Sequence, residues 1–417
     1  MKVKKEKINL ILTYIITLVM ILDCNSIFIT GSHFQLFNRI GMIAMLVSVG
    51  ILIYNFHPSQ SAWQHYAIIG IIISVYVIAY AIFSYYQKFP SDIKLILSIL
   101  LKFLIVFSLV ELIYKNQGIP SIFASYVNVI FIIAIISIFF WFFGSYLHLI
   151  HPTGKYWSNW AHYSVKRYNY KPSYFNVYFE TQVLKGIVRN SAIFAEAPMA
   201  SLTFSIGLTL ENLFGEQRAH HNLKLIVLTF AILTTLSSTG YICIIINLVY
   251  LLLIKIHNTK YSSLIIGMLL FIGIIVISGI FIEKLHSHSG SSRSKDYRNA
   301  FLAFKKYPIF GVGFGNGVKL KDGIGKFGYS NSFGRIIGEG GIYISILYLL
   351  AFIRSFFLAL ENKNLQRLFF TIIVAFLFVT TIFVNSYLMY FLLSFLAFWK
   401  PIGKMELVEN EENIYPI

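Results

Sequence analysis

The chain has 417 residues, of which 57% are hydrophobic and only 12% are charged, and its formal net charge is +17. Because soluble domains carry about 25% charged residues, this composition excludes an ordinary soluble protein. Apolar runs of roughly 20 residues recur along the whole chain, which is the pattern of transmembrane helices. Strands of a membrane β-barrel would alternate with period two, whereas runs such as Ile68 to Phe83 are continuous.

These runs predict an all-α polytopic membrane protein with about 12 transmembrane helices in a single integral membrane domain, residues 1–417. The basic start, MKVKKEK, precedes a run without a small-residue cleavage site, so we interpret that run as the first span. The seventh and eighth spans are short, and a broken or re-entrant pair is an alternative for 222–256. The predicted spans are 8–29, 37–54, 65–86, 94–114, 123–147, 196–214, 222–237, 239–256, 262–282, 334–358, 368–384 and 386–399.

Two long connections, 148–195 and 283–333, interrupt this series, and long connections are usually functional. The predicted spans place both termini on one side of the membrane and both long loops on the other. In the short loops, Lys and Arg concentrate on the side of the termini, which predicts cytoplasmic termini and extracytoplasmic long loops. An inverted topology is the alternative. The tail, 405–417, holds four Glu and no Lys, and we expect it to be disordered in the cytoplasm.

The long loops thus hold positive charge outside the membrane against the usual bias, and an anionic ligand such as a phosphate is the simplest reason. The stretch from Glu283 to Arg335 alone contains ten Lys or Arg. At the end of the first long loop, Arg189 precedes Glu196 by seven residues. An Arg binds a phosphate through two parallel hydrogen bonds, and a carboxylate could act as a general base or hold the Arg in place. For Glu196, a stabilising acid in the first turn of a helix is an equal alternative.

The second long loop offers Arg293 and Arg298, which could face one pocket, although the pair taken alone favours a solvated basic face. After them, Gly311, Gly313 and Gly315 alternate in the sequence GVGFGNG. A phosphate-binding glycine motif needs a strand before it and a helix after it, so we expect these glycines to shape a turn instead.

At the start of the tenth span, Asn331 could cap the helix, and Arg335 and Glu339 are four residues apart, on one helical face. Helix N-termini bind anions, but a structural pair is an equal explanation for Arg335 and Glu339. No His, Cys or acidic cluster has metal-ligand spacing, and we expect no metal site. Other polar residues lie on or beside apolar runs. Lys102 lies within a span, and we expect Asp23, Glu111 and Glu211 to reach the membrane surface from span ends.

The order of these groups resembles the O-antigen polymerase and O-antigen ligase superfamily, which includes the Wzy-type polysaccharide polymerases. An Arg and an acid lead into a middle span, and a Thr/Ser-rich turn, the Arg298 group, the glycine turn and a Gly-rich helix start follow. The motifs that carry this resemblance are TLSSTG at 235–240, RNAFL at 298–302, PIFGVGFGN at 308–316, Asn331 and GEGG at 338–341.

The resemblance implies a metal-independent, membrane-embedded glycosyltransferase with a GT-C-like arrangement of spans and no cofactor. Its substrates would be oligosaccharide repeat units on undecaprenyl pyrophosphate, which it would polymerise into a capsular, exo- or O-antigen polysaccharide at the outer face of a bacterial plasma membrane. The leaving group is a pyrophosphate, so catalysis chiefly needs cations. We therefore expect Glu196 and Arg298 to be catalytic, and the pyrophosphate to be bound by Arg189, Arg293, Arg298 and Arg335.

Aromatic residues of the first long loop, including Tyr156 and Tyr174, could stack on sugar rings or form an interfacial belt. A chain-length regulator and a flippase are possible partners of such an enzyme, and we expect no nucleic-acid partner. In the ligase branch a His often precedes the Asn that corresponds to Asn331, whereas this chain has Ser330 there, which favours a polymerase. A ligase, a transporter or flippase of lipid-linked sugars, and a receptor or inert scaffold are the alternatives. The absence of a visible repeat counts against transport.

Overall fold

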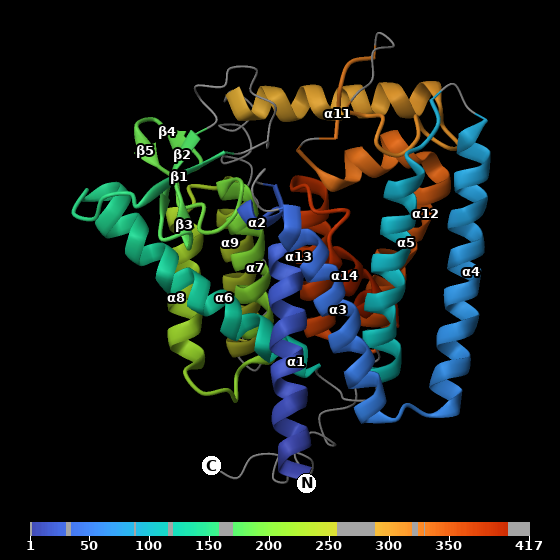
Figure 1. Cartoon of the computed structure of the whole chain (residues 1–417), viewed down its shortest axis with the longest axis horizontal. Coiled ribbons are helices and arrows are strands. Elements are labelled where there is room, and N and C mark those ends of the chain that lie inside the picture. The colour runs from blue at the N-terminus through green and yellow to red at the C-terminus, as the bar shows by residue number, and fades with distance from the viewer. Residues whose placement is uncertain are drawn as a thin grey trace.

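A computed structural model describes residues 2–30, 35–86, 89–115, 120–157, 170–256, 288–318, 324–328 and 330–398 of the chain. Most of these residues are helical, and the long helices stand side by side as a bundle (Figure 1). One helix, α11 (His288–Lys306), lies across the end of the bundle opposite to the N-terminus. The strands lie at the same end as α11, so the described parts of both long connections are on one side of the bundle (Figure 1).

The helices before the first long connection are α1 (Lys2–Leu22), α2 (Ile27–Thr30), α3 (Gln35–Phe56), α4 (Gln60–Tyr85), α5 (Ile93–Ser108) with its π-helical continuation η2 (Leu109–Tyr114), and α6 (Ser121–Phe140) with its continuation η3 (Trp141–Tyr146). Those after it are α7 (Ala197–Phe214), α8 (His221–Thr234), α9 (Ser238–Ile256), α11, α12 (Ser332–Glu361), α13 (Leu365–Thr380) and α14 (Tyr387–Phe398).

Within the described residues, five helical segments are long and apolar enough to cross a membrane, as the composition predicts for a membrane protein. They are Arg39–Phe56, Gln60–Tyr85, Ile93–Tyr114, Ser121–Tyr146 and Ser332–Glu361. The apolar helices α8, α9, α13 and α14 are shorter. Residues 222–256 form two helices, α8 and α9, joined by a tight turn. The predicted span 262–282 and the predicted tail, 405–417, lie outside the described residues, and the total of about 12 spans stays a prediction.

The first long connection contains two small antiparallel sheets that the apolar pattern did not predict. Strands β1 (Gly154–Trp157), β2 (Tyr170–Tyr174) and β3 (Tyr178–Phe179) form one sheet in that order, with Gly154 opposite Ser173 and Ser173 opposite Phe179. Strands β4 (Val183–Leu184) and β5 (Ile187–Val188) form a hairpin. Its two-residue turn, Lys185 and Gly186, has positive φ at both positions, as such hairpins require.

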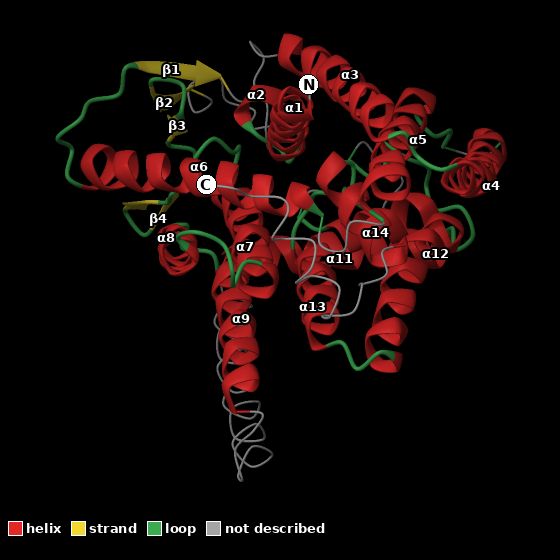
Figure 2. Cartoon of the chain, turned by 90° about the horizontal axis from the view of Figure 1, so that it is seen from below, coloured by secondary structure: helices red, strands yellow, loops and turns green. Residues whose placement is uncertain are grey.

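The centre of the bundle is α7, in which every residue except Pro198 is buried. A helix that is surrounded on all sides has no polar face, and α7 accordingly carries small Ser, Thr and Gly side chains where its neighbours approach closely. Its main neighbours are α6, α8 and α9. Helix α9 extends away from the bundle when the molecule is seen from below (Figure 2). The N-terminus of α7 lies at the end of the bundle that carries the long connections.

Helix α11 is polar over most of its surface, and a narrow strip of small residues packs it against the rest of the protein. Ala300 and Ala303 are buried together with Val312 of the glycine turn and Phe327. The helix packs mainly on α12. This packing places the beginning of α11 over the ends of α12 and α13, where the polar groups of the candidate site gather.

Candidate functional site

The side chain of Arg189 is fixed by backbone carbonyls of the turn between α8 and α9. Strand β5 ends at Val188, and the next residue donates from Nε to the carbonyl oxygen of Thr235 at 2.8 Å and from Nη2 to that of Leu236 at 3.2 Å. Its Nη1 donates to Gln182 Oε1 at 3.1 Å. Leu236 has a positive φ of 50°, and this conformation turns its carbonyl toward the guanidinium. Backbone carbonyls of the TLSSTG motif, residues 235–240, therefore hold the Arg189 side chain in place.

Arg293 reaches the same end of the bundle from α11. Its Nη1 donates to the carbonyl oxygen of Thr380 at 2.8 Å, at the last residue of α13. One turn along α11, the hydroxyl of Tyr297 donates to the carbonyl oxygen of Val379. Helix α11 is thus attached to the end of α13 by two side chains on one face.

Electrostatic coupling links Arg189, Glu196 and Arg293, which come from three different segments. Burial lowers the pKa of Arg189 to about 10, and the positive charge of Arg293 acts in the same direction, while Glu196 opposes the shift. Burial also lowers the pKa of Arg293, and Glu196 is the main group that opposes it. A pKa of about 10 keeps Arg189 protonated at neutral pH. The structure therefore brings together two partly buried cations and one carboxylate, and we call these three residues the cationic cluster.

Arg298 does not join this cluster. It lies five residues after Arg293 on α11, which places it about 140° around the helix axis at 3.6 residues per turn, and its side chain is exposed. The predicted catalytic role of Arg298 is therefore not supported by proximity to Arg189 or Glu196, and it stays a prediction.

Asp296 organises the entry to α12, a role that the sequence analysis missed. Its Oδ1 accepts the amide of Gly328 at 2.7 Å, and its Oδ2 accepts both the amide and the hydroxyl of Ser330, at 3.0 and 2.5 Å. The following residue, Asn331, caps α12 by accepting the amide of Gly334 at 2.5 Å. The amide of Ser332 then donates to the carbonyl of Thr381 at 3.0 Å, which joins the start of α12 to the end of α13.

Arg335 and Glu339 form an ion pair one turn into α12, with Nε and Oε2 3.1 Å apart and the Glu339 side chain fully buried. The other carboxylate oxygen of Glu339 accepts the amide of Gly317 at 3.2 Å. Its backbone carbonyl accepts the hydroxyl of Tyr80 at 2.8 Å. Glu339 is therefore a structural centre between α4, α12 and the glycine turn, and Arg335 is oriented by it.

The glycine turn lies directly against the backbone of α12. Gly311, Gly313 and Gly315 all have positive φ, and a Cβ at Gly311 would lie 2.5 Å from the carbonyl oxygen of Glu339. The amide of Val312 donates to the carbonyl of Gly338, and that of Gly313 donates to the carbonyl of Glu339. Because these amides already have protein partners, the turn does not present them as a phosphate cradle. This geometry agrees with a turn that lets two backbones approach closely.

Three acidic residues that the sequence analysis placed at the membrane surface are buried instead. The side chain of Asp23 is 6% exposed and pairs with Lys102 of α5 at 2.7 Å. Glu111 lies in the π-helical segment η2 and pairs with Lys115 at 2.5 Å and with His65 at 2.7 Å. At the end of α7, Glu211 pairs with Arg218 and His221. Each prediction of a surface-reaching side chain was wrong because it considered neighbours in the sequence only, and these acids have cationic partners on other segments or one turn away.

The aromatic residues of the first long connection are divided between a core and the surface. Tyr156 and Tyr174 are buried within the sheet region, so neither ring is available to stack on a sugar. Phe175, at the turn between β2 and β3, is 64% exposed. Residues 158–169, which include further candidates, lie outside the described residues.

A cavity of about 250 Å³ lies between α4, α5, α12 and α14, and its walls are almost wholly apolar. Phe314 of the glycine turn lines it, and Arg354 and Phe398 line it as well. The hydroxyl groups of Tyr348 and Tyr390, 3.5 Å apart, are among its few polar groups. Within the part of the chain that the structure describes, no group of three or more His, Cys, Asp or Glu side chains could hold a metal ion.

These features define a mainly helical membrane protein with a cluster of two arginines and a glutamate at one end of the bundle. Residues 223–349 match the family model described as O-antigen ligase, which confirms the resemblance to the O-antigen polymerase and ligase superfamily. The matched segment includes Arg293, Asp296, Arg298 and Arg335, whereas Arg189 and Glu196 lie before it. No curated protein matches the chain significantly. The matched segment, less than a third of the chain, is therefore similar to O-antigen polymerase- or ligase-type membrane enzymes, which are glycosyltransferase-like.

Proposed function

We propose that this protein polymerises oligosaccharide repeat units carried on undecaprenyl pyrophosphate, at the outer face of a bacterial plasma membrane. The observation that carries the proposal is the cationic cluster, in which the partly buried Arg189 and Arg293 are electrostatically coupled to Glu196. Two fixed guanidinium groups at the end of an apolar bundle suit a diphosphate whose hydrocarbon chain remains in the membrane. The product would be a capsular, exo- or O-antigen polysaccharide.

The proposed reaction transfers the growing chain from its carrier to a new repeat unit. A hydroxyl of the acceptor sugar attacks the anomeric carbon of the donor, and the bond from that carbon to the pyrophosphate oxygen breaks. Glu196 takes the proton of the hydroxyl, and Arg189 and Arg293 stabilise the charge that develops on the leaving pyrophosphate. Removing one such electrostatic contact typically lowers the rate by about 10²–10³-fold. Arg189 and Arg293 suit this role because backbone carbonyls fix their orientation before any substrate binds.

The apolar cavity supports a substrate with a long hydrocarbon chain. It is lined by four helices, and Phe314 connects its wall to the glycine turn, which packs on the same helix that carries Arg335. An isoprenoid chain in this cavity would keep its pyrophosphate near the end of the bundle where α11 lies. Arg335, oriented by Glu339, would then provide a further cation near the start of α12.

The second candidate function is that of a ligase, which performs the same transfer to a different acceptor. The position where ligases often have His is Ser330, and its hydroxyl is engaged by Asp296 at 2.5 Å. A hydroxyl that is held in this way supports a structural role for the position and favours the polymerase.

The test is the length of the polymer made by cells that carry only Arg293→Ala or Arg189→Ala, with the amount of membrane protein measured in each. We expect single repeat units at the outer face and no ladder. Lys305→Ala is the matched control, because Lys305 is exposed on the same helix as Arg293. A normal ladder in Arg293→Ala would refute the proposal. Repeat units that accumulate inside the cell would indicate a flippase, and repeat units that are polymerised but not passed to a final acceptor would indicate a ligase.

A further inference from the structure

The turn between α13 and α14, residues 381–386, is attached to the rest of the protein through its own backbone. Ser332 donates to the carbonyl of Thr381 from both its amide and its hydroxyl, and its hydroxyl also accepts the amide of Phe383 at 2.9 Å. The carbonyl of Ile382 accepts Nδ2 of Asn25 at 3.0 Å. Arg293 binds the preceding carbonyl, that of Thr380. The position of Arg293 in the cationic cluster therefore depends on where this turn is held.

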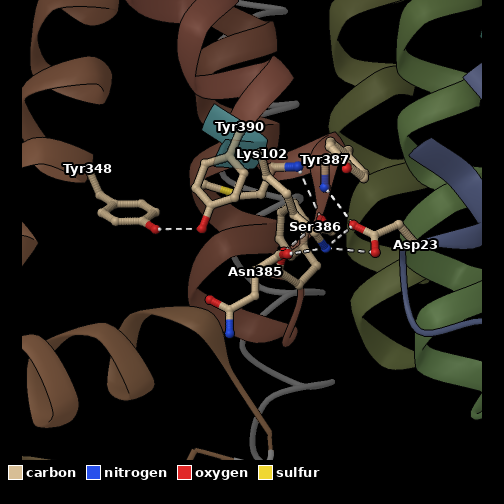
Figure 3. A network of polar contacts seen from close by, with 9 residues as sticks. Asp23, Lys102, Tyr348, Asn385, Ser386, Tyr387 and Tyr390 are labelled. Carbon is tan, nitrogen blue, oxygen red and sulfur yellow. Dashed lines mark hydrogen bonds and ion pairs between the residues drawn. The ribbon is translucent and has the colours of Figure 1, made fainter. Parts of the chain in front are cut away.

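At the other end of the turn, Lys102 and Asp23 hold the backbone together (Figure 3). Nζ of Lys102 lies 2.7 Å from both carboxylate oxygens of Asp23 and donates to the carbonyl of Asn385 at 3.0 Å. Oδ2 of Asp23 accepts the amide of Tyr387, the first residue of α14, at 2.8 Å. The Lys102 and Asp23 side chains are 16% and 6% exposed. Charged residues on apolar membrane helices are costly and usually mark a functional role.

The residues that follow Asp23 continue to the other half of the cationic cluster. The carbonyl of Asn25 accepts the amide of Ala195 at 3.0 Å, and the amide of Ile27 donates to the carbonyl of Ile193 at 2.9 Å. Ala195 is the neighbour of Glu196. The segment Asp23–Ile27 thus contacts the turn that holds Arg293 on one side and the segment that carries Glu196 on the other. The segment Asp23–Ile27 therefore connects the turn that holds Arg293 to the segment that carries Glu196 through its own hydrogen bonds.

We propose that the Asp23–Lys102 ion pair is a positioning pair for the glycosyl transfer, an inference that rests on the proposed function. It touches no substrate. It fixes the register between the turn 381–386 and the segment 190–196, and hence the separation of Arg293 and Glu196. A displacement of about 1 Å in such a constellation lowers the rate by about 10²-fold.

The test compares Lys102→Met with Lys102→Arg in membranes, using the rate of repeat-unit transfer at saturating donor. Lys102→Met removes the charge, and we expect at least a tenfold fall in rate. Lys102→Arg keeps a cation that can reach Asp23 and Asn385, and we expect it to restore most of the rate. The matched control is Lys115→Met, which breaks the buried pair with Glu111 further along the same helix and away from the turn. We expect this control to lower thermal stability but to leave the transfer rate unchanged.

Cys24 gives a readout that does not depend on activity, because its thiol is fully buried next to Asp23. In a Cys243→Ser background, we expect alkylation of Cys24 by a small maleimide to be slow in the parent and in Lys102→Arg, and fast in Lys102→Met. An unchanged transfer rate in Lys102→Met, or an equal loss in Lys115→Met, would overturn the positioning role. Failure of the proposed function would appear separately, as a normal polymer ladder in Arg293→Ala.

Discussion

At the scale of single residues, the difference between the arginines lies in what holds them. Arg189 and Arg293 are partly buried, and the hydrogen bonds given for them go to main-chain carbonyls and, for Arg189, also to the Gln182 side chain. Arg335 instead pairs with Glu339, and Arg298 is exposed. The hydrogen bonds to neutral carbonyls fix these two guanidinium groups without neutralising them, and the cluster as a whole has two cations to one carboxylate. This is why we place the pyrophosphate beside the first two.

The lowered pKa of Arg189 predicts how anion binding depends on pH. Burial lowers the pKa of Arg189 to about 10, so Arg189 stays charged through the neutral range and loses its proton at high pH. We expect binding of inorganic pyrophosphate to the purified protein to be constant between about pH 7 and pH 9 and to weaken above about pH 10. In that upper window the folded protein binds fewer protons than the unfolded chain, so the free energy of unfolding gains a contribution from Arg189 as pH rises. Calorimetric titration over pH 7–11 checks the binding, and the same curve in Arg189→Ala would contradict the assignment.

At the scale of elements, the glycine turn packs so closely against the backbone of α12 that the position of each depends on the other. Gly311 has φ of 67°, and an added Cβ would meet the carbonyl of Glu339 at 2.5 Å. We expect Gly311→Ala to destabilise the protein by about 1–3 kcal/mol, because both the backbone strain and the displacement of α12 oppose it. Thermal unfolding of the purified protein measures this change. Gly154→Ala is the control, since nothing lies within 4 Å of its added Cβ and its φ is not positive. Equal melting temperatures for the two variants would contradict the packing described here.

The sequence was sufficient to predict elements wherever a local pattern determined them. Continuous apolar runs predicted most of the long helices, and Asn331 was recognised as a helix cap because capping needs only neighbouring residues. The short strands β1 to β5 were missed because two- to five-residue strands between polar loops have too little pattern to detect.

The candidate site was predictable only in part, for the same reason. Arg189 and Glu196 are close in the sequence, but their coupling to Arg293 depends on how α11 lies over the bundle. The Asp23–Lys102 pair spans 79 residues of sequence, and nothing in the local pattern of either residue indicates the other. Tertiary packing, rather than composition, decides which charges meet.

At the scale of the whole molecule, polar groups lie at two opposite ends of the bundle. The β strands and α11 lie at the end away from the N-terminus, as Figure 1 shows, and α11 carries Arg293 of the cationic cluster. The pair of Glu211 with His221 lies at the opposite end of α7 from Glu196. The proposed function requires such a polarity, because it places the substrate at the outer face and the N-terminus of the chain at the other end of the bundle.

This arrangement predicts the orientation in the membrane. With both native cysteines replaced by Ser, Lys185→Cys at the β4–β5 turn should react with a membrane-impermeant maleimide in intact cells. Lys7→Cys in α1 should react only after the cells are made permeable. The reverse pattern of labelling would show that the termini face outward and would contradict a reaction at the outer face.

The central claim is that the cationic cluster carries out glycosyl transfer with Glu196 as the base. Its most direct test is transfer by the purified protein in liposomes, supplied with lipid-pyrophosphate-linked repeat units, with Glu196→Gln compared with the parent. We expect the parent to form a ladder of polymers and Glu196→Gln to lose at least about 10²-fold in rate, the effect typical of a removed general base, while it still binds pyrophosphate. A Glu196→Gln ladder formed at the parent rate would contradict the claim.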